Sequence, residues 1–365
     1  MLKKNRIASV ELLRIISMLM IIAYHWELHG NNGKIIFSPL SIKQFFSFAI
    51  GSWGTVGVDL FFIISSYFLL KSKYIKINRI IILIIKVSLY GTVILLIANL
   101  AGITEFNLVE MIKSVLGVFA YQYWFIVVYL VIYCLHPTIN MVITRLSEKY
   151  YLFILCILLF CTYGLGFIFT NELVGRLACG ITIYFLIGFL EKYPQKKKRF
   201  SNYGLLICLS GILGILFAEC LLSYIGMKYL GKANSIINRM QMTQSPVMLI
   251  VSCSFFYFIF DKNISGNKVI DFLGKYSVGA YLLHGGSSFI KNYLWDDLLK
   301  AGELYRSGPL LNYISHYIIS VIAIFGIGCL AEYIVDYFIQ IFVNRIMSLK
   351  TTTKAQDTFM TPIDR

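Results

Sequence analysis

The residues with the clearest chemical potential lie in the first apolar segment of the chain. Residues 11–30 read ELLRIISMLMIIAYHWELHG, which places Arg14 and His25 eleven positions apart. On an α-helix this spacing is three turns plus about 20°, so both side chains share a face, about 16 Å apart along the axis. A guanidinium binds anions, and an imidazole exchanges protons near neutral pH. The pair suits a long anionic donor held near Arg14 and a reaction near His25, although an Arg14 that pairs with Glu11 and a His25 that caps a helix would need no reaction.

Three further ionisable side chains fall in or beside apolar segments, where an unpaired charge is costly. Asp59 lies in GTVGVDLFFIISSYFLL, and it can hydrogen-bond a histidine or an acceptor hydroxyl, or pair with a neighbouring helix to fix packing. Arg79 and Lys86 are seven residues apart and share a helix face. An isolated lysine there requires an anion, either a phosphate of a bound cofactor or a carboxylate of the protein.

A metal centre is not expected. His25 and His29 are four residues apart and could share a metal ion, but Glu27 between them points to another face and the zinc-protease order HExxH is absent. The eight cysteines are scattered through apolar segments without a CxxC pair. They indicate small buried side chains rather than a disulfide framework or a zinc ribbon.

The composition predicts that these residues are held in a membrane. The chain is 58% hydrophobic and 14% charged, whereas soluble domains are nearer half apolar and a quarter charged. The net charge of +15 is spread over short gaps between apolar runs, which argues against a nucleic-acid partner. We predict an all-α, polytopic helical bundle of about ten transmembrane helices in a lipid bilayer. The expected spans lie near residues 10–28, 53–71, 79–101, 116–136, 150–170, 174–191, 203–223, 244–261, 270–290 and 310–340.

The positions of Lys and Arg predict the orientation in the cell membrane. With the N-terminus inside, the inner segments carry 21 of these residues and the outer segments 10, and the two that lie within helices complete the 33. An even number of spans then places both termini in the cytoplasm. Residues 1–347 are expected to form one transmembrane domain, and residues 348–365 a polar cytoplasmic tail without fixed structure.

Four segments, taken in order, resemble the membrane acyltransferase-3 family, whose members O-acylate surface carbohydrates. The first is an arginine, ten residues and a histidine, here Arg14 and His25. The second is GVDLFFIISSYFLL, which is similar to the family's GVxxFFxxSGFLL. The third is YWFIVVYLVIYCLHP, and the fourth is KYSVGAYLLHG, which is similar to its final SYxIYLIH helix. Each motif is short, and their order along the chain makes the resemblance specific.

Two departures from the family pattern concern the second motif and the segment after it. Ser66 stands where the family usually has a glycine after Ser65. The paired arginines that follow the family's second helix are replaced by a diffuse basic run that leads to Arg79 and Lys86. This second departure affects the contacts expected for the acyl donor.

The resemblance implies transfer of an acyl group, usually acetyl, from cytoplasmic acyl-CoA to a hydroxyl of a cell-surface polysaccharide or its lipid-linked precursor. In that reaction His25 would act as general base or as a transient acyl carrier. The sequence around Trp124, YQYWFIVVYL, also fits an interfacial aromatic belt. The remaining roles that the resemblance implies are Arg14, Arg79 and Lys86 for acyl-CoA, Asp59 or Glu27 for orienting His25, and Trp124, Tyr123 and His284 for the sugar.

Two other classes of function fit a polytopic chain with buried charges. A carrier or flippase for a polysaccharide or lipid-linked sugar could line its pathway with these residues, but we find no inverted repeat and no matching pair of Gly- or Pro-broken helices. A sensor or assembly partner without catalysis would not need His25. Dependence on acyl-CoA distinguishes the enzyme from both.

Overall fold

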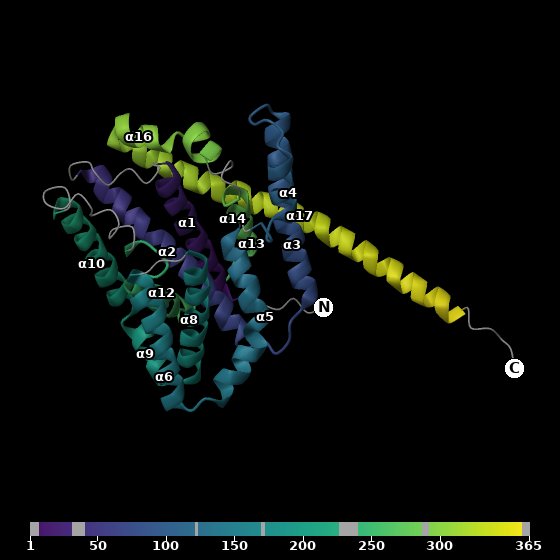
Figure 1. Cartoon of the computed structure of the whole chain (residues 1–365), viewed down its shortest axis with the longest axis horizontal. Coiled ribbons are helices and arrows are strands. Elements are labelled where there is room, and N and C mark those ends of the chain that lie inside the picture. The colour runs from purple at the N-terminus through teal and green to yellow at the C-terminus, as the bar shows by residue number, and fades with distance from the viewer. Residues whose placement is uncertain are drawn as a thin grey trace.

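The structure, a computed structural model, describes residues 7–30, 41–120, 123–168, 172–225, 240–286 and 292–359. Throughout these ranges the regular elements are helices, and no strand occurs in them. Most of the helices run side by side in one bundle, whereas α17 (Leu310–Phe359) leaves the bundle and projects far beyond it (Figure 1). The predicted all-α, polytopic bundle is confirmed.

Eight helices in the described ranges are long and apolar enough to cross a bilayer. A ninth apolar helix, α12 (Pro246–Phe260), has only 15 residues. The span expected near residues 270–290 is broken into α13 (Lys268–Tyr276) and α14 (Val278–His284), and residues 287–291 lie outside the described part. The eight long helices are α1 (Ala8–Gly30), α2 (Ile42–Leu69), α3 (Ile77–Leu100), α5 (Trp124–Arg145), α6 with its continuation (Glu148–Ile168), α8 (Glu172–Lys192), α10 (Gly204–Ile225) and α17.

Two helices begin at other residues than the hydropathy predicts, and for one of them a polar cap marks the start. α2 begins at Ile42 rather than near residue 53, since the Ser41 side chain accepts a hydrogen bond from the backbone N–H of Gln44. The fourth expected span begins at Trp124 rather than near residue 116. Before it lies a separate short helix, α4 (Leu108–Leu116), which ends at Gly117 with a φ of +45°.

α17 continues past the domain boundary expected at residue 347. It is helical to Phe359, where the sequence predicted a tail without fixed structure, and residues 360–365 lie outside the described part. Its 50 residues span about 75 Å at 1.5 Å per residue, more than twice the roughly 30 Å of a hydrocarbon core. Residues Leu310–Ile341 are long and apolar enough to cross a membrane, and residues 348–359 read SLKTTTKAQDTF, which is mostly polar. The end of the helix therefore extends beyond the membrane-spanning length.

α1 lies at the centre of the bundle and packs against α2, α13, α14 and α17. Close approach of α1 and α2 requires glycine on α2, because a Cβ on Gly57 would lie 2.6 Å from the backbone oxygen of Ser17. The same holds between α14 and α17, where a Cβ on Gly328 would overlap the backbone of Ala280. These contacts bring the residues of α1 within reach of the last helices of the chain.

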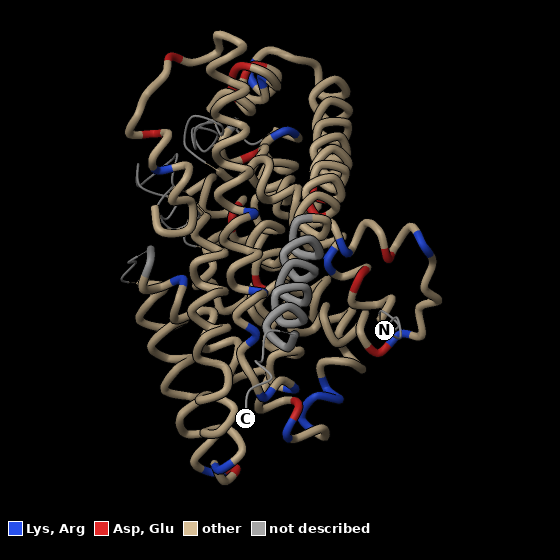
Figure 2. Tube along the Cα trace, turned by 90° about the vertical axis from the view of Figure 1, so that its right-hand side faces the viewer, with Lys and Arg blue, Asp and Glu red and all other residues tan. Residues whose placement is uncertain are grey.

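The loops that the sequence places inside the cell meet at one end of the bundle. Asn140 on α5 donates to the carbonyl of Leu69 at the end of α2 (2.9 Å), and Lys192 at the end of α8 donates to carbonyls at the end of α5. Ser9 at the start of α1 donates to the carbonyl of Phe260 at the end of α12 (3.4 Å). Clusters of Lys and Arg mark the end where α5 turns into α6, at the bottom of Figure 2.

The glycine contact between α14 and α17 generates a stability prediction. In Gly328→Ala the new methyl group meets backbone atoms, which cannot rotate away, so we expect a loss of about 1–3 kcal/mol in the free energy of unfolding. Gly326→Ala is the matched control, since a Cβ there has no neighbour within 4 Å and alanine favours a helix over glycine by about 0.5–1 kcal/mol. The apparent Tm of detergent-purified protein, followed by size-exclusion chromatography after heating, should fall only for Gly328→Ala. Equal Tm values would contradict the packing described.

Candidate functional site

A cavity of about 430 Å³ lies among α1, α2, α3, α5, α13, α14 and α17, on the side of the bundle where α1 begins. Its lining includes Arg14, Arg79 and Lys86, the three basic residues that the sequence analysis assigned to an anion. The structure therefore brings together side chains from two separate helices, α1 and α3. Lys275 of α13 also lines the cavity and was missed, because the sequence analysis counted it only as an orientation signal.

Arg14 and Arg79 reach this cavity with different partners. Arg14 donates to Glu11 on the same helix (2.8 Å), and 29% of its side chain remains exposed. Its guanidinium also lies 5.9 Å from the ring of Phe68. Arg79 is exposed at the start of α3 and makes no salt bridge within the described part of the chain. Both guanidinium groups can therefore meet an anion that enters the cavity.

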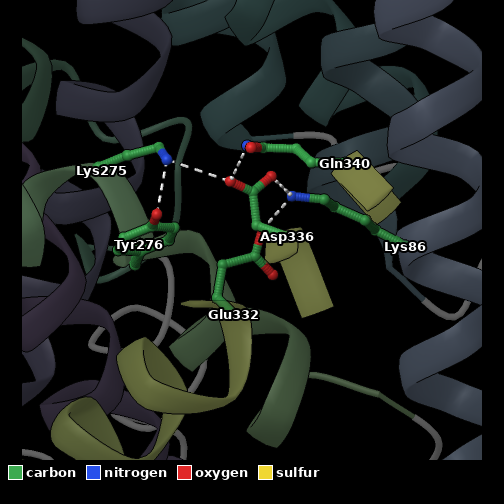
Figure 3. A network of polar contacts seen from close by, with 6 residues as sticks. All are labelled: Lys86, Lys275, Tyr276, Glu332, Asp336 and Gln340. Atoms are coloured by element: carbon green, nitrogen blue, oxygen red, sulfur yellow. Dashed lines mark hydrogen bonds and ion pairs between the residues drawn. The ribbon is translucent and has the colours of Figure 1, made fainter. Parts of the chain in front are cut away.

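Lys86 has its counter-charge within the protein. Its Nζ lies 2.5 Å from Glu332 and 3.0 Å from Asp336, both on α17. Asp336 also binds Lys275 (3.1 Å) and accepts from Gln340 (2.9 Å), so α3, α13 and α17 share one network of balanced charge (Figure 3). Of the two anions that the sequence left open for Lys86, the structure supplies the carboxylates. The side chain of Lys86 also remains part of the cavity wall, and its assignment to acyl-CoA stays a prediction.

His25 borders a second, smaller cavity of about 50 Å³. Trp124 lines the same cavity. Three apolar residues, Phe61, Phe125 and Val278, line both cavities. The cavity of Arg14 and the cavity of His25 thus share one apolar wall, which extends between two side chains placed about 16 Å apart on α1.

His25 is in direct contact with His284, the last residue of α14. The Nδ1 of His25 lies 2.9 Å from the Nε2 of His284, and the Nδ1 of His284 lies 2.5 Å from the carbonyl oxygen of Ala280. The His284 side chain is completely buried and packs edge-on against the ring of Trp295. The assignment of His284 to sugar binding stays a prediction.

The two carboxylates proposed to orient His25 face other helices. Glu27 accepts hydrogen bonds from Ser47 of α2 and from Tyr313 of α17 (3.0 Å for the latter). This direction follows from the helix, since a residue two positions from His25 is rotated by about 200°. Asp59 is completely buried and accepts from Ser252 of α12 (3.4 Å), which is the packing role that the sequence left open for it. That either residue orients His25 stays a prediction.

The aromatic residues at the start of α5 divide into one that faces the site and one that does not. The ring of Trp124 carries the guanidinium of Arg176 at 4.4 Å, a cation–π contact. Arg176, at the start of α8, was counted in the sequence only as an outer basic residue. Tyr123 is completely buried and donates to the carbonyl of Leu282 (3.0 Å). Its assignment to the sugar stays a prediction. In the described residues no group of three or more His, Cys, Asp and Glu side chains could hold a metal ion.

The network around Lys86 generates a second prediction. In Lys86→Met two carboxylates lose their shared cation in an apolar surrounding, so we expect a loss of about 3–5 kcal/mol in the free energy of unfolding. Lys86→Met combined with Glu332→Gln should recover part of this loss. Lys113→Met is the control, because Lys113 pairs with Glu110 on an exposed surface, where a pair contributes less than about 1 kcal/mol. Thermal unfolding of the purified variants measures the difference, and a Lys86→Met protein as stable as the control would refute the structural role.

Comparison with known proteins identifies one family. A family model described as an acyltransferase domain matches residues 7–333. The match begins before Arg14, includes His25 and His284, and ends just after Glu332. No curated protein and no solved structure matches the chain. Because the family model covers most of the chain and both cavities, this protein belongs to the acyltransferase-3 family.

Proposed function

We propose that the protein transfers an acyl group, acetyl in the simplest case, from cytoplasmic acyl-CoA to a hydroxyl of a cell-surface polysaccharide or its lipid-linked precursor. Membership of the family supports acyl transfer in general. The observation that carries the finer proposal is the pair of cavities, with Arg14 and Arg79 in one, His25 in the other and a shared apolar wall between them.

The larger cavity matches the two chemical parts of an acyl-CoA. Its phosphates are anionic, and a guanidinium binds such oxygens through two parallel N–H groups. Arg14 and Arg79 are the candidates for this contact. The arm that carries the thioester is uncharged, and it would lie against Phe61, Phe125 and Val278, the side chains common to both cavities. The acyl carbon would then arrive beside His25.

The basic loops support entry of the donor from the cytoplasm. Lys and Arg predominate in the segments expected inside, and these loops meet at the end of the bundle where α1 begins. In this orientation the protein is a multi-pass protein of the cell membrane with both termini in the cytoplasm. His25 is then nearer the outer surface, where a surface polysaccharide is accessible.

The chemistry at His25 follows from the needs of an ester-forming reaction. As general base, the imidazole takes the proton from the acceptor hydroxyl while the oxygen attacks the thioester carbon. The carbon–sulfur bond then breaks, and the imidazolium returns its proton to the sulfur. A transient acyl-imidazole is the alternative path. Trp124, which lines the cavity beside His25 and is held by Arg176, is the candidate surface for stacking of the sugar ring.

Ester-linked acetate on purified surface polysaccharide tests this proposal in cells. We expect acetate in cells with the wild-type chain and its fall to the level of cells without the chain in His25→Ala, because the base is lost. His316→Ala, which removes another histidine of a membrane span, should retain acetylation. Immunoblots must show equal amounts of each protein in the membrane.

Two results would contradict the proposal. Full acetylation by His25→Ala would exclude His25 as the base or acyl carrier. Equal acetate in cells with and without the wild-type chain would exclude acetylation of that polysaccharide. Separately, transport of a polysaccharide or lipid-linked sugar without any dependence on acyl-CoA would favour a carrier.

A further inference from the structure

We infer that His284 is a positioning residue that determines which nitrogen of His25 carries the proton. The inference rests on the proposed role of His25 as base, and it assigns to His284 a function other than sugar binding. Its basis is the chain of two hydrogen bonds that joins the carbonyl of Ala280, the ring of His284 and the ring of His25.

The first hydrogen bond fixes the proton on His284. A carbonyl oxygen only accepts, so the Nδ1 of His284, 2.5 Å from the oxygen of Ala280, must carry a hydrogen. A neutral imidazole holds one hydrogen, and the Nε2 of His284 is then an acceptor. This carbonyl lies four residues before His284 on α14, and the ring is completely buried. The helix and the packing together hold this tautomer.

The second hydrogen bond likewise determines which ring nitrogen of His25 carries the hydrogen. Because the Nε2 of His284 accepts, the Nδ1 of His25 at 2.9 Å must donate. The neutral ring of His25 then has its hydrogen on Nδ1 and its basic lone pair on Nε2. The base presented to an acceptor hydroxyl is therefore Nε2, and proton uptake there leaves the Nδ1–H bond to His284 in place and strengthens it by charge.

The surroundings of His284 explain why an imidazole is suited to accept the hydrogen bond from His25. The ring packs against Trp295 of the π-helix η4 (Tyr293–Leu298) and against Tyr281 one turn earlier on α14. A neutral acceptor orients His25 without adding a fixed negative charge to an apolar interior, where an ionised group is costly. The nearby carboxylate of Glu27 has its oxygens on Ser47 and Tyr313. His284 thus has the orienting role that the sequence assigned to a carboxylate.

The tautomer of His25 can be measured without reference to any activity. The full chain, labelled with ¹⁵N-histidine and placed in lipid nanodiscs, contains five histidines, and two-bond ¹H–¹⁵N spectra distinguish protonated from unprotonated ring nitrogens. The His25 signals are assigned by their absence in His25→Asn. We expect protonated Nδ1 and unprotonated Nε2 in the wild type, the same in His284→Gln, whose amide oxygen can accept, and a changed tautomer in His284→Leu.

Acyl transfer by the same preparations supplies the second readout. With acetyl-CoA and the surface polysaccharide, kcat of His284→Leu should fall by about 100-fold, within the range of general-base catalysis, while KM for acetyl-CoA changes less than about threefold. His284→Gln should recover most of kcat. His316→Leu is the control for loss of another histidine in a membrane span and should retain both constants.

The outcomes separate this inference from the proposed function. A protonated Nε2 on His25 in the wild type, or an unchanged His25 tautomer in His284→Leu, would overturn the positioning role. A fall in kcat of equal size in His284→Gln and His284→Leu would also overturn it. The expected tautomers in a wild-type protein that transfers no acyl group would support the role of His284 and overturn the proposed function instead.

Discussion

The cost of an uncompensated charge in an apolar surrounding governs the arrangement of this protein. In the bundle, Lys86 meets Glu332 and Asp336 across a separation of about 250 positions in the chain, and Asp336 also binds Lys275. This network holds α17 against α3 and α13. Arg14 meets Glu11 but keeps part of its side chain exposed, and Arg79 lies at an exposed helix start. The cationic side chains that line the larger cavity therefore differ in how far their charge is already paired within the protein.

The candidate site has two parts along α1, the cavity at Arg14 and the cavity at His25. One face of α1 carries Arg14 and His25, and glycines on neighbouring helices let its partners approach closely. α14 ends at His284 directly behind His25, and α5 begins at Trp124 beside it. In the proposed reaction, donor binding and proton transfer would be separated along one helix, and the apolar wall of Phe61, Phe125 and Val278 is common to both cavities.

Features that depend on local sequence could be predicted, and features that depend on distant partners could not. The shared face of Arg14 and His25 follows from helix geometry, and the helical bundle follows from apolar runs. The partners of Lys86, His25 and Asp59 are 246, 259 and 193 positions away in the chain, so no spacing rule identifies them. The sequence could name the anion required by Lys86 only as a choice between phosphate and carboxylate.

The helix boundaries also show what the sequence could and could not predict. Hydropathy located the long helices, but it merged the broken pair α13 and α14 into one span and did not detect that Ser41 starts α2 early. The break at Ser277 matters for the site because it separates α13, which carries Lys275, from α14, which carries His284 as its last residue. Capping and helix breaks depend on one or two polar side chains, which an average over an apolar window does not register.

A structure of the protein in nanodiscs with a non-hydrolysable thioether analogue of acetyl-CoA tests the central claim most directly. The account predicts that the phosphates contact Arg14 and Arg79, that Lys86 stays paired with Glu332, and that the sulfur lies in the cavity beside His25. Phosphates bound by Lys86 with its carboxylates displaced, or a sulfur atom remote from His25, would contradict it.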